Sequence, residues 1–256
     1  MTREVIALAF LNFKQGVRER LFLGAVFFFI FFLSLCILMG LLSPGETDKV
    51  LRSSGLAGIE LSALILLIFS LVLNFYKEKE ERVLEIYLTH FSRSSYLWGK
   101  LIGYSLIAFF YILICGAGYL VMLVIYKAFL WQVAVSLYNI FLKLSLAIGI
   151  SLVFSSLFSS PVLALLSSLF LYMSSEMAYP ALKILSMNID ASGYRLPLFK
   201  IIYYLLPNMH KLDIKALAVY GELPSWPYFI LITIYTFIYI FFLCWIAQLI
   251  FNRKEY

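Results

Sequence analysis

Long apolar segments alternate with short polar ones along most of the chain. The first, residues 21–42, contains no charged residue. It is longer than the apolar region of a signal peptide and long enough to cross a bilayer, so it predicts an uncleaved spanning helix. The whole pattern predicts six transmembrane helices, at residues 21–42, 57–76, 101–126, 133–158, 162–179 and 226–251.

Turn-forming residues separate these runs. Proline-containing turns follow the first and fourth runs, and Pro180 is expected to end the fifth. Trp131 precedes the fourth run, a position typical of an anchor at the membrane interface. Residues 181–225 are less apolar, and their apolar stretch at residues 198–206 is too short to cross. We expect short helices in this outer segment, packed against the bundle.

Residues 1–20 predict an amphipathic helix instead of a span. Their apolar positions advance by three or four residues and therefore share one helical face, between basic and acidic side chains. These positions are Ile6, Phe10, Phe13, Val17 and Leu21. A basic amphipathic helix of this kind lies in the membrane interface. A plain cytoplasmic tail is the alternative.

Composition agrees with a membrane protein. Apolar residues make up 63% of the chain, charged residues make up 13%, and the mean hydropathy is +0.96. A soluble domain of 256 residues could not bury so much apolar surface, whereas lipid can face it. The predicted fold class is an all-α polytopic membrane protein, with residues 1–256 forming a single transmembrane domain. The cysteines lie in apolar runs and the histidines are isolated, so no metal site is predicted.

The distribution of Lys and Arg predicts the orientation. With the N-terminus in the cytoplasm, the inner segments carry eleven basic residues and the two short outer loops carry three. The long outer segment carries more, but long loops weigh little in this rule. Both termini and the polar hairpin at residues 77–100 are therefore expected to be cytoplasmic.

This hairpin contains a helical pattern. Val83, Leu84, Tyr87, Leu88 and Phe91 share one face, and charged residues occupy the others. A short helix with an apolar ridge and charged flanks suits docking into a groove on a partner. A hairpin lying on lipid headgroups is the alternative, but its four glutamates would be repelled by an anionic inner leaflet.

Three ionisable residues lie inside predicted spans: Glu60, Lys143 and Glu176. A rise of about 1.5 Å per residue places all three in the outer half of the membrane. We expect Lys143 to pair with Glu60 or Glu176, because a lone ammonium group there is costly. The pair either fixes helix packing or gates substrate. Amide side chains in the spans are expected to form interhelical hydrogen bonds: Asn74, Asn139 and Gln248.

No catalytic motif is present. The sequence has no GxxxxGK[ST], HExxH or GxSxG, so the chain is not predicted to be an enzyme. Any energy from nucleotide would have to come from a partner.

The layout resembles the permease subunits of type-2 ABC exporters. Those subunits have an amphipathic helix, six spans, a charged second cytoplasmic hairpin and short helices before the last span. Their hairpin typically carries a charged run with Gly-Thr-Leu-Glu, then Pro-x-Ser-Arg, and Gly-Lys at the start of the third span. This chain has Glu80-Glu81-Arg82-Val83-Leu84-Glu85, Ser92-Arg93 and Gly99-Lys100, with Arg82-Val83 in place of Gly-Thr and without the Pro before Ser92. Two later segments resemble the branch that includes permeases of copper-enzyme maturation systems: Leu205-Leu206-Pro207-Asn208 and Leu212-Asp213-Ile214-Lys215.

The resemblance implies an exporter subunit of the inner (cytoplasmic) membrane that forms the substrate path as a dimer. Separate cytoplasmic ATPase subunits would bind ATP and Mg²⁺ and drive it, and no cofactor is expected on this chain. Further expected partners are a second permease copy, the bilayer and a periplasmic accessory protein, but no nucleic acid. The hairpin helix would sit in a cleft of the ATPase, with polar contacts from Glu80, Glu81, Arg82 and Glu85 and an apolar anchor from Leu84, Tyr87 and Leu88. We expect Arg93 and Lys100 to mark the level of the lipid headgroups.

Two alternatives from other classes stay open. A self-contained channel or ion-coupled carrier predicts inverted repeats and broken midspan helices, and the sequence has neither. A passive membrane anchor of a larger complex would leave Glu60, Lys143 and Glu176 without a role. The sequence does not identify the substrate.

Overall fold

The computed structural model describes residues 2–43, 45–187, 200–201, 203–204 and 206–253. All the secondary structure in these ranges is helical. The helices are α1 (Thr2–Arg18), α2 (Arg20–Leu41), α3 (Thr47–Glu80), α4 (Val83–His90), α5 (Arg93–Ile125), α6 (Trp131–Leu157), α7 (Pro161–Met187), α9 (Met209–Leu212), α10 (Lys215–Val219) and α11 (Trp226–Arg253). Six of them, α2, α3, α5, α6, α7 and α11, are long and apolar enough to cross a membrane, as predicted.

Several helices extend beyond the predicted spans. α3 begins at Thr47, ten residues before the predicted start, and ends at Glu80, whereas α5 already begins at Arg93. Hydropathy detects only the apolar part of a helix, but the backbone hydrogen bonds continue into polar turns. Pro180 does not end the fifth span: α7 continues through it to Met187. A proline removes one backbone donor, which transmembrane helices tolerate.

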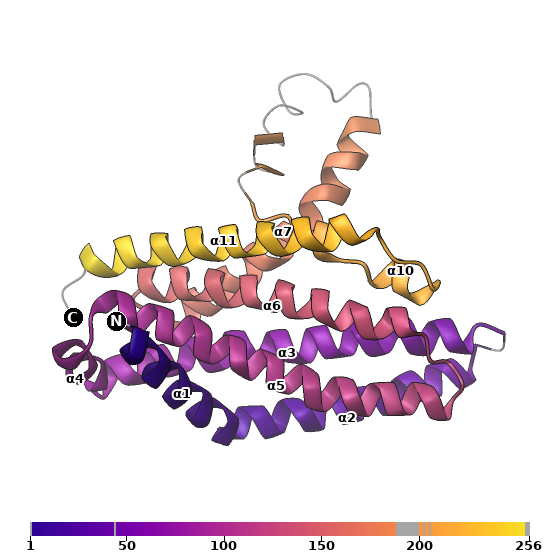
Figure 1. Cartoon of the computed structure of the whole chain (residues 1–256), viewed down its shortest axis with the longest axis horizontal. Coiled ribbons are helices and arrows are strands. Elements are labelled where there is room, and N and C mark those ends of the chain that lie inside the picture. Colours follow the sequence, from indigo (N-terminus) through magenta and orange to yellow (C-terminus); the bar gives the residue numbers. More distant parts are fainter. Residues whose placement is uncertain (1, 44, 188–199, 202, 205, 254–256) are drawn as a thin grey trace.

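The spanning helices run side by side, with α3 and α6 at the centre (Figure 1). In the most apolar stretches of α3 and α6, 72% and 78% of the residues are buried, against 17% in α2 and 22% in α7. The start of α1, the whole of α4 and the end of α11 lie at one end of the bundle (Figure 1). The short helix α10 lies toward the other end. In the expected outer segment, residues 188–199, 202 and 205 lie outside the described part of the chain.

A row of four buried tyrosines joins α5 to α3. Tyr96, Tyr104, Tyr111 and Tyr119 follow one another at intervals of seven or eight residues, about two helical turns, and so share one face. Each phenol makes a hydrogen bond to α3: to the Glu78 carboxylate (2.6 Å), the Asn74 amide (2.8 Å), the Ser62 hydroxyl (2.8 Å) and the Arg52 carbonyl (2.8 Å), in that order. We call these residues the tyrosine row.

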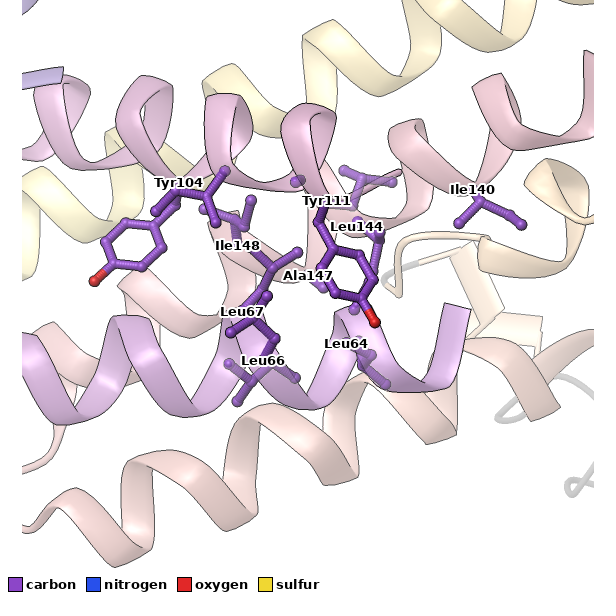
Figure 2. Packing of buried hydrophobic residues seen from close by; sticks show 14 of the residues in the cluster. Leu64, Leu66, Leu67, Tyr104, Tyr111, Ile140, Leu144, Ala147 and Ile148 are labelled. Atoms are coloured by element: carbon purple, nitrogen blue, oxygen red, sulfur yellow. The ribbon is translucent and has the colours of Figure 1, made fainter. Parts of the chain in front are cut away.

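Aliphatic side chains fill the space beside this row. Leu64, Leu66 and Leu67 of α3 lie near Leu144, Ala147 and Ile148 of α6 in Figure 2, with Tyr104 and Tyr111 approaching from α5. All of these side chains are buried. The apolar residues of α3 and α6 therefore serve mainly to pack the interior, whereas most apolar residues of α2, α7 and α11 are exposed and suited to face lipid.

Helix α1 packs on α5 through two glycines. A Cβ atom at Gly99 would lie 2.6 Å from the Cβ of Leu8, and one at Gly103 would lie 2.8 Å from the carbonyl oxygen of Ala9. Small residues four apart allow such close backbone approach. The outer face of α1 exposes Ile6 and Phe10. That apolar face is compatible with the expected interfacial position, which stays a prediction.

The close contact at Gly103 can be tested by adding one methyl group. Gly103→Ala should destabilise the protein by about 1–3 kcal/mol, because the new Cβ meets the α1 backbone and α1 must move. Gly118→Ala on the same helix is the matched control, because its Cβ would meet nothing within 4 Å. Thermal melting in detergent and protease sensitivity of α1 measure the difference. Equal melting temperatures for the two variants would contradict the close packing.

Candidate functional site

Five ionisable side chains meet inside the bundle. Lys143 of α6 lies 2.5 Å from a carboxylate oxygen of Glu60, 2.8 Å from one of Glu176 and 3.5 Å from one of Asp213. Lys215 pairs with Glu60 and lies 3.3 Å from Asp213. We call Glu60, Lys143, Glu176, Asp213 and Lys215 the ion cluster. Tyr172 adds a hydrogen bond by donating to Glu60 at 2.7 Å.

Four different parts of the chain supply these groups. Glu60, Lys143 and Glu176 come from α3, α6 and α7, whereas Asp213 and Lys215 come from the segment of α9 and α10. Asp213 also accepts a hydrogen bond from the Lys215 backbone N–H at 3.0 Å, which fixes its carboxylate at the start of α10. Arg52 of α3 donates to the Val219 carbonyl and so holds α10 against the bundle.

The ion cluster has more negative than positive groups. Three carboxylates face two ammonium groups, and Lys143 is only 1% exposed. Burial raises the pKa of the Asp213 carboxyl, but the neighbouring Lys143 and Lys215 outweigh it and hold that pKa below its usual value. The cluster thus links α3, α6 and α7 to the α9–α10 segment through charges that are costly to separate.

The structure therefore brings together all three charged residues singled out inside the spans, and Lys143 contacts both expected partners. Asp213 and Lys215 were missed as partners because they lie between spans, where hydropathy treats a charge as ordinary. The available clue was a pair of opposite charges two residues apart in a largely apolar stretch.

The amide side chains in the spans differ in their surroundings. Asn74 bonds to Glu19 and Tyr104, and Gln248 accepts from Ser94 at 3.4 Å, so both join helices as expected. Asn139, one turn before Lys143, is buried, and neither of its polar atoms has a hydrogen-bond partner among the described residues. The interhelical bond expected for Asn139 is absent from this part of the structure.

A second candidate site is the exposed face around α4. Glu80, Glu81, Glu85 and Ile86 are exposed, and Ile86 has 61% of its surface accessible. Arg82 separates α3 from α4 with a left-handed backbone, at φ 57°. This conformation favours glycine, so Arg82 adopts a backbone that residues with a side chain rarely adopt. We call Glu80, Glu81, Glu85 and Ile86 the α4 face.

The apolar ridge of α4 points toward the bundle instead of outward. Leu84 is 1% exposed, and the Tyr87 ring lies 6.3 Å from that of Tyr96. Leu88 also packs against the core. The expected anchor of Leu84, Tyr87 and Leu88 therefore holds α4 to its own chain, because burying these side chains there removes them from water. Ile86 is the most exposed large apolar side chain of α4.

Arg93 and Lys100 both bind groups of the protein itself. Lys100 is fully buried and lies 2.9 Å from the Glu78 carboxylate, which also accepts from Tyr96. Arg93 donates to the carbonyls of Phe251 and Asn252 at 3.2 and 3.0 Å, and so caps the last turn of α11. The burial of Lys100 excludes the expected contact with headgroups for that residue. Arg93 is half-buried, so its expected position at the headgroup level stays a prediction. We call Glu78, Arg93, Tyr96 and Lys100 the α4 base.

Comparison of the sequence with models of known protein families and with curated proteins finds no match. The proposals below therefore depend on the residues and geometry of this chain.

Proposed function

We propose that this chain is the membrane-spanning permease subunit of an ABC exporter. It works as a dimer and is driven by separate cytoplasmic ATPase subunits. The observation that supports this most is α4, a short helix at the end of the bundle that also holds the start of α1 and the end of α11. That position suits a contact with a soluble motor.

The α4 face has the chemistry of a docking surface. Three exposed glutamates lie within six residues of the exposed Ile86 along the chain. Carboxylates close to an exposed apolar residue would complement a groove with a basic rim, and charge complementarity of this kind guides and orients a partner. The chain has no nucleotide-binding motif of its own, so the partner must supply the hydrolysis.

The α4 base supports a mechanical role for this helix. The ion pair between Lys100 and Glu78 joins α5 to α3, and Arg93 joins α5 to the end of α11. A force applied to α4 would therefore reach three spanning helices at once. In this proposal, closure of the ATPases moves the permease chains as rigid bodies.

The substrate path is proposed to lie between two copies of the chain. Side chains fill the space among α3, α5 and α6 (Figure 2), whereas α2, α7 and α11 carry much exposed apolar surface. A two-fold interface formed by such helices supplies a path that one copy does not need to enclose. The ion cluster would then transmit movements of the spanning helices to the α9–α10 segment.

An ion-coupled carrier is the second candidate. The observation that favours it is the excess of one carboxylate in the ion cluster, because buried uncompensated charge at membrane depth attracts a proton or a cation. Transport that continues without any nucleotide would support this candidate over the exporter.

The docking role can be tested by charge reversal. The triple variant Glu80→Lys, Glu81→Lys and Glu85→Lys should bind the ATPase about tenfold more weakly or worse, because like charges would meet across the interface. Affinity purification from native membranes, followed by quantification of the ATPase, measures the loss. The matched control reverses three exposed acids toward the opposite end of the bundle: Glu46, Asp48 and Glu222. Equal ATPase recovery from both triple variants, or none with the unaltered chain, would refute the proposal.

A further inference from the structure

A recess of about 460 Å³ lies where α1 meets α3, at the end of the bundle that holds α4. Its lining combines basic, amide and apolar side chains. The lining residues are Leu11, Lys14, Gln15, Arg18, Glu19, Asn74 and Lys77. Three of the seven are cations, and they come from two different helices.

The one acidic residue of this lining, Glu19, is already hydrogen-bonded within the protein. Glu19 accepts hydrogen bonds from Ser70 at 2.6 Å and from Asn74, both on α3. Lys14 and Arg18 are exposed and form no ion pair within the described residues. Lys77 lies 3.9 Å from Glu81 across exposed surface, a contact worth little. The recess therefore has a surplus of positive charge available to an anion.

The recess lies at the level along the spanning helices where lipid headgroups are expected. Arg18 and Glu19 directly precede α2, and Lys77 follows the apolar run at residues 57–76. Both helices therefore leave the apolar layer at this level. Leu21 and Leu73, two residues from Glu19 and four residues from Lys77, are exposed and can contact acyl chains.

We propose that this recess binds the phosphate of an anionic phospholipid headgroup. Lys14, Arg18 and Lys77 would pair with the phosphate oxygens, and the Gln15 amide can donate one hydrogen bond. Basic pockets beside spanning helices hold such headgroups. Free phosphate shares this chemistry, but the position beside exposed leucines favours the lipid. The inference does not depend on the proposed ATPase partner.

The test compares lipid nanodiscs of phosphatidylcholine alone with nanodiscs that also contain phosphatidylglycerol. Phosphatidylglycerol should raise the melting temperature of the unaltered protein and remain bound to it in native mass spectrometry. A triple variant, Lys14→Gln, Arg18→Gln and Lys77→Gln, should lose the rise and retain several-fold less lipid. The control variant, Lys49→Gln, Lys127→Gln and Lys183→Gln, alters three lysines away from the recess and should keep both effects. Should the triple variant fail to fold, Lys14→Gln and Arg18→Gln alone serve the same comparison, because both side chains are exposed.

Inorganic phosphate in phosphatidylcholine nanodiscs identifies the source of the anion. It should leave the melting temperature unchanged if the site requires a lipid. A rise with phosphate alone, lost in the triple variant, would assign the recess to free phosphate and overturn the lipid proposal. Persistence of the phosphatidylglycerol effect in the triple variant, or its equal loss in the control, would also overturn it.

Discussion

Replacing Lys143 with methionine should reduce the free energy of unfolding by about 3–5 kcal/mol, the usual cost of removing one partner from a buried ion pair. Lys143 contacts three carboxylates, and Lys215 compensates only Glu60 and Asp213 once Lys143 is gone. Glu176 would be left facing like charges without a cation. Chemical denaturation in detergent micelles measures the loss.

A second substitution distinguishes charge from packing. The double variant Lys143→Met and Glu176→Gln removes one positive and one negative charge, so the ion cluster keeps its original balance. It should recover a large part of the lost stability. If Lys143→Met alone unfolds like the unaltered protein, Lys143 does not hold the helices together. If the double variant is as unstable as the single one, lost packing and not unpaired charge is the cause.

Replacing Lys100 with methionine should cost a similar amount, about 3–5 kcal/mol, and should also loosen α4. Glu78 would lose a cation at 2.9 Å while remaining buried beside Tyr96. The ammonium group also lies 5.8 Å from the Phe75 ring and 5.3 Å from the Tyr96 ring, so two cation–π contacts are lost with it. Hydrogen exchange of the amides of Val83–His90 should become faster.

Lys77→Met, studied in detergent without phospholipid, is the control for this experiment. Lys77 lies next to Glu78 in sequence, but its side chain is exposed and only loosely paired, so its loss should change stability by no more than about 1 kcal/mol. Unchanged hydrogen exchange in α4 after Lys100→Met would show that the α4 base does not restrain this helix. Under the proposed function, the same variant should bind the ATPase but transport poorly.

The spans were predictable because few structures other than a membrane helix accommodate some twenty consecutive apolar residues. The helical pattern of residues 83–91 likewise predicted α4, which the structure places at Val83–His90. The extra turns of α3 and the passage of α7 through Pro180 were not predictable from hydropathy. Those parts of the helices depend on backbone hydrogen bonds and on packing with neighbours.

The candidate sites were predicted only in part, because periodicity identifies a face but not what covers it. Leu84 and Tyr87 were correctly placed on one face, yet that face meets the chain's own core. The contact between Glu60 and Lys215 joins residues 155 positions apart, which no local pattern indicates. The ion pair between Lys100 and Glu78 was not predicted, because the two residues lie on different helices.

The tyrosine row also limits how this protein can change shape. Its four phenols bond to α3 at successive levels along the two helices. A shift of α5 past α3 by a single turn, about 5.4 Å, would break all four bonds together and leave every phenol beside the wrong partner. These hydrogen bonds thus strongly oppose sliding of α5 along α3, and the two helices form one rigid unit. In the exporter that we propose, α3 and α5 would therefore move as one unit with the rest of the chain.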